Sequence, residues 1–521
     1  MAINTNKQKE VKKARIASWP APDDELYQKL GAAHADIAQL QMAFQGTIVL
    51  PTDPDYDQDR EGNPLYPAYP KIIAYCAVFS DVGLALEWAH RQSDWVVTCR
   101  SGGHSTAGFS VNNGMVLDVS RINYVLIDKM QMVMRVGAGA NWGQVIAELT
   151  ANKVHTVTGG CPDVGVAGYT MGGGYGFTSR QFGMSSDTVL YMTVMLADGT
   201  IVVASPANQY ADLFWALRGG TGNNFGVLLE IAYRIYNLDL LWGFGIRWPL
   251  FQAPDALTVM QAQYMKTGAP KELGYQTVLA TMKDGTQALA MLGMYPGSSE
   301  DGMAILQPLL QTPGAQLFYS RTDTYAYLNE HLLDDNLNPP IDGLVEFKRA
   351  GYIARMLNGG DWVQVVKYFQ TSPNKFNLVG IEPYGGAINA VSAYDSAFIH
   401  RDVSMDFFVD SFFTEDGSTS KEQAKMWLDG FMNLTAGFYN GHVYQNYPWR
   451  DFSNYRWAYW GDALPTLVAI KNKYDPGNFF RFEQSISFYP EDDSDITRSK
   501  APSRQKAILG AAKAQSLKED S

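Results

Sequence analysis

Hydrophobic and polar positions along residues 60–236 follow the periods of short strands and helices. A helix is predicted after Ser80 and Asp81, which can cap its first turn, because apolar residues then recur at helical spacing up to residue 89. The β-rich run 95–100 predicts a strand directly after this helix. Further strands are predicted at residues 115–119, 132–136 and 226–235. We therefore expect one α+β domain in this part of the chain.

Turn and cap residues mark further boundaries. Asn141 can cap a helix over residues 142–152, since its side chain can accept a hydrogen bond from the first helical turn. Asp198 and Gly199 stand between two β-type runs and predict a tight hairpin. A short helix over residues 209–217 is predicted to stop at the diglycine that follows it.

The rest of the chain differs in segment length and in residue composition. Residues 238–460 contain longer segments with more Trp and Tyr and fewer glycine clusters, which indicates a second domain with a sheet and helices. Residues 1–20 and the last thirty, from about residue 491, are polar and charged, so we expect both ends to be poorly ordered or peripheral.

Composition and charge exclude several classes of function. The chain has 53 acidic and 41 basic side chains and a net charge of −12, which opposes binding to nucleic acid. It has no apolar run of about 18 residues, so we expect no membrane span. It begins without an apolar signal segment, so a cytoplasmic location is expected. Three cysteines are too few for a disulfide scaffold, and we expect no metal site.

Two glycine-rich segments carry the candidate chemistry. The first, RSGGHS at residues 100–105, is a diglycine bend after a strand, where the backbone can approach a pyrophosphate closely. It lacks the GK[ST] ending of a P-loop, and taken alone it is better explained as an ordinary strand-terminal turn with a surface histidine. The second, residues 158–176, ends in GGGYG but lacks the long helix that a Rossmann fingerprint requires.

These segments resemble a known family when they are taken with three later motifs. RGGTGNNFGV at 218–227, YQNY at 444–447 and KYDPGNFFR at 473–481 follow them in the same order. Together they are similar to the flavin-linked oxidases of the berberine bridge enzyme type, within the vanillyl-alcohol oxidase fold family. The resemblance implies an α+β fold with a two-part FAD-binding domain at 1–237 and 466–521. A substrate domain at 238–465, with an antiparallel sheet backed by helices, would stand between the two parts.

The resemblance also implies how FAD is held. His104 matches the histidine that binds the flavin 8α carbon, and Cys161 the cysteine that binds flavin C6, so the attachment is expected to be bicovalent. Cys76 and Cys99 are expected to be core thiols. The other expected cofactor-binding residues are Arg100, Ser101, Gly102, Gly103, Ser105, Val164, Gly165, Gly168, Gly172, Gly173, Gly174, Tyr175, Gly176, Val227, Asn446 and Asn478.

Catalytic roles follow from the same resemblance. Tyr447, the second tyrosine of YQNY, matches the base that takes the hydroxyl proton while a hydride leaves for flavin N5. Strand alternation in GIEPYGGAIN places Glu382 and Tyr384 on one face, and either could assist Tyr447 or bind a sugar. An exposed glutamate and a packed tyrosine are the alternative interpretation.

Val164 matches a position at which valine is associated with oxidase activity in plant relatives. The resemblance therefore implies that O2 is reduced to hydrogen peroxide. Thr221 and Asn223 depart from the glycines of many relatives, and Thr106 replaces an aromatic residue common in oligosaccharide oxidases. We expect an FAD oxidase of a CH–OH group in a sugar, glycoside or specialised metabolite, acting as a monomer or homodimer on a small substrate with O2. The alternatives are oxidative cyclisation or dehydrogenation at a C–N or C–C centre, and an inactive glycan-binding derivative.

Overall fold

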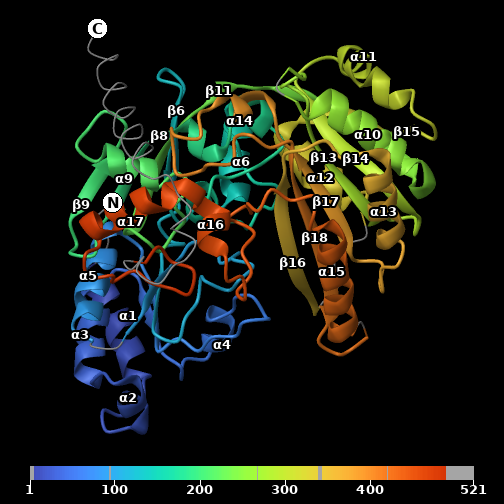
Figure 1. The fold of residues 1–521 in the computed structure, drawn as a ribbon. Helices are drawn as coiled ribbons and strands as arrows, with labels where there is room; N and C mark the ends of the chain where they lie inside the picture. The colour runs from blue at the N-terminus through green and yellow to red at the C-terminus, as the bar shows by residue number, and fades with distance from the viewer. Residues whose placement is uncertain (1–4, 93–94, 267, 338–342, 419, 488–521) are drawn as a thin grey trace.

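A computed structural model describes residues 5–92, 95–266, 268–337, 343–418 and 420–487. Helices and sheets combine in two halves that lie side by side (Figure 1), which confirms the predicted α+β class. The first half contains a four-stranded, a five-stranded and a two-stranded sheet, and the second half contains one seven-stranded sheet. Within the described ranges, we find no helix with the length and apolar character needed to cross a membrane.

The first half begins with a four-stranded sheet of order β1-β2-β4-β3, in which β4 pairs in parallel with both β2 and β3. A five-stranded antiparallel sheet follows, of order β5-β6-β10-β8-β9. The strands are β1 Thr47–Val49, β2 Ile72–Tyr75, β3 Val97–Arg100, β4 Met115–Asp118, β5 Val125–Asp128, β6 Val133–Gly137, β7 Val154–His155, β8 Val189–Met195, β9 Ile201–Ala204, β10 Val227–Arg234 and β11 Tyr236–Asn237. The helices are α1 Thr5–Ala17, α2 Glu25–Leu30, α3 His34–Ala43, α4 Tyr56–Asp59, α5 Phe79–His90, α6 Trp142–Ala151, α7 Val166–Met171, α8 Ser179–Phe182, α9 Ala211–Ala216 and the 3₁₀ turn η1 Ser185–Thr188.

Most local predictions in this half are confirmed. Asn141 caps α6 and forms a reciprocal capping box with Gln144. The turn at Gly199 joins β8 to β9 as a hairpin. The predicted cap at Ser80 and Asp81 is wrong, because both residues lie inside α5. The buried carboxylate of Asp81 instead accepts the backbone N–H groups of Gln45, Gly46 and Ala77.

Residues 5–17 form helix α1 in a segment for which the sequence predicted poor order or a peripheral place. Helix α1 packs against α3, and Arg15 donates to the Ile48 carbonyl at 2.8 Å and to Asp53 at 2.9 Å. A polar, lysine-rich helix is held here by directed hydrogen bonds, which hydrophobic periodicity does not register. The predicted disorder of the C-terminal thirty residues falls outside the described ranges.

The second half is one antiparallel sheet of order β15-β12-β14-β13-β17-β18-β16, with α10, α13 and α15 along its outer side (Figure 1). The strands are β12 Leu240–Pro249, β13 Gly274–Thr281, β14 Gln287–Tyr295, β15 Gln316–Thr324, β16 Leu344–Ile353, β17 Leu378–Pro383 and β18 Met405–Thr414. The helices are α10 Ala253–Tyr264, α11 Ser299–Leu310, α12 Tyr325–Asp334, α13 Gly359–Phe369, α14 Gly386–Ala390 and α15 Lys421–Thr435, with the 3₁₀ turn η2 Leu250–Gln252.

The two faces of this sheet have opposite characters. Odd-numbered residues of β18, such as Phe407 and Val409, join the apolar core beneath the helices. Even-numbered residues point to the other face, where Asp406 stands in register with Glu382 of β17 and Tyr352 of β16. The inner face therefore carries ionisable groups toward the first half.

The chain returns to the first half after the sheet. Helices α16 (Tyr455–Trp460) and α17 (Leu464–Tyr474), with η3 (Gly461–Ala463) between them, join the large core of that half. The buried Lys471 donates to the carbonyls of Asn224 and Phe480 and pairs with Asp475, each at 2.6 Å. The domain limits at residues 237 and 465 themselves stay a prediction.

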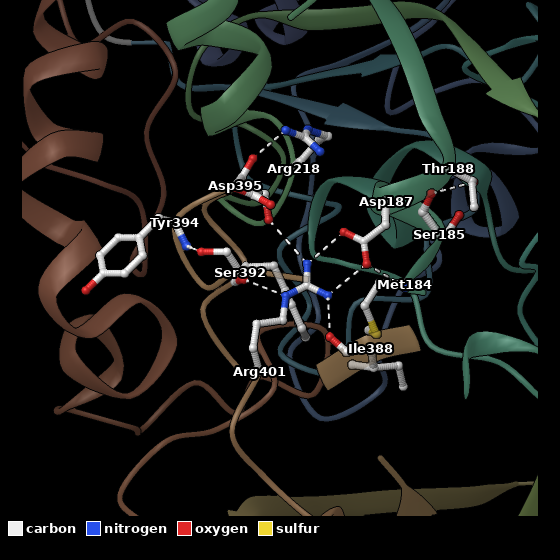
Figure 2. Close-up of polar contacts among 12 residues, drawn as sticks. Met184, Ser185, Asp187, Thr188, Arg218, Ile388, Ser392, Tyr394, Asp395 and Arg401 are labelled. Atoms are coloured by element: carbon white, nitrogen blue, oxygen red, sulfur yellow. Dashed lines mark hydrogen bonds and ion pairs between the residues drawn. The ribbon is translucent and has the colours of Figure 1, made fainter. Parts of the chain in front are cut away.

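A buried ion pair joins the two halves. Figure 2 shows Asp187 of η1 facing Arg401, which lies in the segment between α14 and β18. The two guanidinium nitrogens each donate to one carboxylate oxygen at 2.7 Å, and both side chains are under 10% exposed. The same segment contacts the RGGTGNN motif, since the Phe398 N–H donates to the Arg218 carbonyl. A bidentate pair of this kind fixes orientation as well as distance.

Candidate active site

The two glycine-rich segments meet backbone to backbone. A Cβ on Gly102 would lie 2.2 Å from the Gly165 nitrogen, and a Cβ on Gly165 would lie 2.3 Å from the Gly102 nitrogen. Neither position admits a side chain, so both must be glycine for the loops to touch. Gly103 follows in the left-handed region with φ +79°, which turns the chain toward His104.

His104 and Cys161 lie on these two loops, and both residues are exposed. The charge of Asp163, two residues after Cys161, acts to raise the pKa of both His104 and Cys161. Partial desolvation lowers the pKa of His104, against the opposing effect of Asp163, so the imidazole is neutral at neutral pH. Val164 is half-buried and packs on the core of the first half. Cys76 is buried, and burial raises the pKa of the Cys99 thiol to about 12, as expected for core thiols.

Several predicted cofactor residues have side chains engaged elsewhere. The Arg100 guanidinium bonds Asp118, the Asp59 carbonyl and the Tyr75 hydroxyl, so it braces the four-stranded sheet. The Ser101 hydroxyl donates to the Ala138 carbonyl, and the Ser105 hydroxyl accepts the Phe109 N–H. Contact of these residues with a cofactor stays a prediction that rests on their backbone.

Contacts within the protein also require glycine at most GGGYG positions, while the predicted contact with a cofactor stays a prediction. A Cβ on Gly172 would lie 1.9 Å from the amide oxygen of Asn446, and one on Gly173 would lie 2.6 Å from the Phe398 ring. Gly174 and Gly176 are likewise crowded by protein atoms. These glycines therefore admit neighbouring protein segments, whereas Gly168 is exposed with no atom within 4 Å of its Cβ direction.

Two further predicted residues also have definite places. Val227 opens β10 with its side chain 1% exposed in the core, so only its backbone could face a ligand. Asn478 has φ +47°, and its buried amide oxygen has no hydrogen-bond partner among the described residues. An unpaired buried acceptor is compatible with a polar ligand group.

The YQNY motif is joined to the GGGYG loop by hydrogen bonds. Asn446 donates to the Tyr169 carbonyl at 2.9 Å and to the Tyr444 hydroxyl at 2.9 Å. The Tyr444 hydroxyl in turn accepts the N–H groups of Gly174 and Tyr175 at 2.9 and 3.2 Å. This network fixes the backbone that presents the next residue, Tyr447.

Tyr447 and Glu382 are in direct contact. The half-buried tyrosine donates from its hydroxyl to Glu382 Oε1 at 2.8 Å. Glu382 is 6% exposed, so the alternative of an exposed glutamate is wrong. Burial raises the pKa of Glu382 to about 7, against the effects of the Tyr447 hydrogen bond and of Lys348.

Tyr384 is placed differently from Glu382. It follows the end of β17, is fully buried, and bonds the Tyr352 hydroxyl at 2.9 Å while stacking on Tyr175 with ring centroids 5.6 Å apart. The geometry therefore separates the two candidate helpers, since the hydroxyl of Tyr384 pairs with Tyr352 and the carboxylate of Glu382 pairs with Tyr447.

Sequence reasoning missed an ionisable cluster beside this pair. Asp406 is fully buried opposite Glu382, and its oxygens accept no well-formed hydrogen bond from the described residues. Burial, reinforced by Glu382, holds the pKa of Asp406 well above its usual range. Lys348 and Asp410 form an ion pair on the same face. The overlooked signal is the segment MDFFVDSFFT, where two aspartates occur four residues apart in a strand rich in aromatic residues.

Comparison with known proteins identifies this arrangement. Residues 70–205 match the family model described as FAD binding domain, and residues 443–487 match the one described as berberine and berberine like. A solved chitooligosaccharide oxidase superposes with a TM-score of 0.76 at 26% identity, covering 87% of this chain and 99% of the other. The chain therefore contains an FAD-binding domain and a berberine-like segment, and it is similar to the berberine bridge enzyme-like FAD-linked oxidoreductases.

The alignments with named relatives cover most of the length of this oxidoreductase. The chitooligosaccharide oxidase of Gibberella zeae is 29% identical over 468 residues, covering 84% of this chain and 92% of the relative. An uncharacterised FAD-linked oxidoreductase of Bacillus subtilis is 27% identical over 451 residues, covering 85% and 96%. The BBE-like 1 protein of Physcomitrella patens shares the fold, with a TM-score of 0.78 at 24% identity over 87% of this chain and 99% of the other.

The residues present fit FAD in this oxidoreductase. The contact between Gly102 and Gly165 forms a surface of bare backbone, suited to a dinucleotide. The unpaired amide oxygen of Asn478 and the exposed His104 and Cys161 supply polar and nucleophilic groups.

Proposed function

We propose that this enzyme oxidises a CH–OH group of a sugar, glycoside or related metabolite, with O2 as acceptor and hydrogen peroxide as product. The observation that carries the proposal is the 2.8 Å hydrogen bond from Tyr447 to a buried carboxylate. Relatives named as chitooligosaccharide, carbohydrate and glucooligosaccharide oxidases support the substrate class.

The proposed proton path uses two groups of this chain. Removing a hydride from a carbinol carbon requires that the hydroxyl proton leave at about the same time. Tyr447 accepts that proton from the substrate and passes its own hydroxyl proton to Glu382 Oε1. When bound, FAD would supply the acceptor for the hydride and the route by which two electrons reach O2. The carbinol thereby becomes a carbonyl, and its proton remains on the couple of Tyr447 and Glu382 until the formation of H2O2 from O2 consumes one proton.

Burial makes this relay effective. The pKa of Tyr447 lies well above its usual range because of burial, followed by the nearby Glu382 and Asp406. An isolated phenol of this kind is a poor base at neutral pH, and the carboxylate provides the place for its proton. We therefore assign Glu382 as the partner of Tyr447, and we assign Tyr384 a packing role beneath the site.

We also propose that FAD is attached through both His104 and Cys161. The support is that both side chains are exposed on loops whose backbones touch at Gly102 and Gly165. A neutral imidazole keeps a nitrogen lone pair available for bonding to carbon. Two tethers would hold the ring without a closing lid and so permit a bulky substrate.

The deciding experiment is an anaerobic titration of the purified yellow protein with a panel of mono- and oligosaccharides. Bleaching of the flavin by a sugar, followed by peroxide formation in air, is the expected result. A panel of cyclic amines serves as the comparison. Bleaching by amines and not by sugars would replace the CH–OH assignment with oxidation at a C–N centre.

Reaction with oxygen is tested separately at Val164. Val164→Leu adds bulk beside the loop that carries Cys161, so reoxidation of the reduced enzyme should slow while reduction by substrate stays the same. Equal reoxidation rates in the two proteins would remove Val164 from the argument.

A further inference from the structure

Lys348 is a buried cation held by two carboxylates. Its side chain is 10% exposed, and its ammonium donates to Glu346 at 3.1 Å and to Asp410, its cross-strand partner on β18. Burial lowers the pKa of Lys348, but Asp410 and Glu346 outweigh this and raise it above the ordinary value. The ammonium is therefore charged throughout the range in which an enzyme of this kind would work.

The same ammonium lies over the ring of Tyr447. Its nitrogen is 4.8 Å from the Tyr447 ring centroid and 4.4 Å from that of Phe408. Phe408 packs on Tyr447 with ring centroids 5.5 Å apart. The ring of Phe408 has room there because residue 380 is a glycine, since a Cβ at that position would lie 2.0 Å from it. The ring of Tyr447 is thus fixed against one cation and one aromatic neighbour.

Three acidic groups near Tyr447 raise its pKa further by their charge when they are ionised. Glu382 comes from β17, Asp406 from β18, and the neighbouring phenol of Tyr444 from the motif itself. All of these oppose ionisation of Tyr447. Lys348 acts in the other direction, since it lowers the pKa of both Glu382 and Asp406.

On the basis of the proposed roles of Tyr447 and Glu382, we propose that Lys348 is a positioning residue that supplies the positive charge for this couple. An ammonium over a ring attracts its π face, and it attracts a phenolate more strongly. Lys348 therefore stabilises the couple in the form that carries one negative charge, ready to accept the substrate proton. Asp410 and Glu346 hold the ammonium in place.

The test is the pH profile of anaerobic flavin reduction in Lys348→Met, which keeps length and removes charge. Loss of the cation that lies over the Tyr447 ring should shift the rising limb of the profile to higher pH by about one pH unit or more. Lys348→Arg should keep the limb near its wild-type position. Because Lys348→Met leaves Asp410 buried without a partner, the double variant Lys348→Met/Asp410→Asn is measured as well, and it should show the same shift.

Lys425→Met is the matched control, because Lys425 pairs with Asp429 on the outer helix α15, where the same chemical change should not move the limb. A second readout does not depend on turnover. The phenolate absorbance of the wild type, after subtraction of that of Tyr447→Phe, reports the ionisation of Tyr447 alone. The same difference, measured with both proteins carrying Lys348→Met, should rise at a higher pH.

The outcomes separate this proposal from the proposed function. A limb at the wild-type position in flavin-loaded Lys348→Met or in the double variant would overturn the role of Lys348 and leave Tyr447 in place. Wild-type reduction by Tyr447→Phe would remove the base and Lys348 together. Failure of both neutral variants to fold would assign Lys348 to stability and overturn the proposal.

Discussion

A single hydrogen bond connects Tyr447 to Glu382, and the burial of the carboxyl makes that bond sensitive to pH. An exposed glutamate would be ionised over the whole working range of an enzyme. Burial raises the pKa of Glu382 to about 7, so its charge changes where activity is measured. At the scale of single residues, this burial decides when the site can accept a proton.

The pH dependence follows with a definite sign. The proton acceptor is the carboxylate, so below a pH of about 7 Glu382 is protonated and flavin reduction should slow, while above it the rate should approach a plateau. Glu382→Gln removes the titrating group, so the rate should be low and lack this limb. Rapid-mixing measurements from pH 5 to 9 check the profile. A Glu382→Gln protein with the wild-type limb would exclude this carboxyl.

Tyr447→Phe tests the base itself. The variant keeps the ring against Phe408 and removes the oxygen, so flavin should load normally while anaerobic reduction falls by about a hundredfold or more, roughly 2.7 kcal/mol of barrier. Tyr384→Phe is the matched control, because it also removes a buried hydroxyl, which in this case bonds Tyr352. An equal loss in both variants would mean that the fall reports packing and not proton transfer.

The proposed tethers are tested by mass and colour. Acid-denatured wild-type protein should stay yellow and carry the extra mass of one FAD. Either His104→Ala or Cys161→Ala should leave the flavin held by the remaining bond, and the double variant should release it on denaturation. Cys99→Ala is the control thiol. Release of all flavin from the denatured wild type would contradict attachment at either residue.

Loop contacts at the scale of elements place these side chains. Strand β3 ends in the loop of Gly102, helix α7 begins directly after Gly165, and these two loops touch without intervening side chains. The GGGYG loop is held from the other side by Asn446 and Tyr444. Three segments distant in sequence therefore meet through hydrogen bonds between side chains and backbone and through missing Cβ atoms.

Gly102→Ala tests the contact between the loops. The new methyl would lie 2.2 Å from the Gly165 nitrogen, so the loops must separate, and overpacking of this kind typically costs about 1–3 kcal/mol of stability. We expect a lower melting temperature and loss of covalent flavin. Gly437→Ala is the control, because a Cβ there meets no atom within 4 Å. Full flavin loading in Gly102→Ala would show that the loops need not touch.

Polar contacts at several places hold the two halves of the whole molecule in register. The most directed of these is the bidentate pair of Asp187 and Arg401 in Figure 2, beside an aromatic cluster that contains Tyr384, Phe398 and Tyr444. This pair connects the GGGYG side of the site to the sheet that carries Glu382. Its geometry therefore bears on the alignment of the site as well as on stability.

Arg401→Met should destabilise the fold by about 3–5 kcal/mol, because it leaves Asp187 buried without its partner. Thermal unfolding measures the change. Arg91→Met removes an exposed pair with Glu87 and should stay within about 1 kcal/mol of wild type. Adding Asp187→Asn should recover part of the loss. Equal melting temperatures for Arg401→Met and Arg91→Met would show that the buried pair does not hold the halves together.

The sequence by itself determined what depends on local order. The cap at Asn141, the hairpin at Gly199 and the strand runs of the first half follow from residues that lie next to one another, and the structure bears them out. The five ordered motifs led to the FAD-linked family in the same way. Motif order is a property of the chain, so no tertiary information is needed to read it.

The tertiary structure decided which distant groups meet. It alone pairs Glu382 with Tyr447 across 65 positions, sends the Tyr384 hydroxyl to Tyr352, and turns the Arg100 guanidinium into the sheet. Asp406 and Lys348 were missed because periodicity shows that a strand has two faces but not which face is turned inward. Burial and cross-strand register set the charge state of these groups, and both arise only when the sheet packs against the first half.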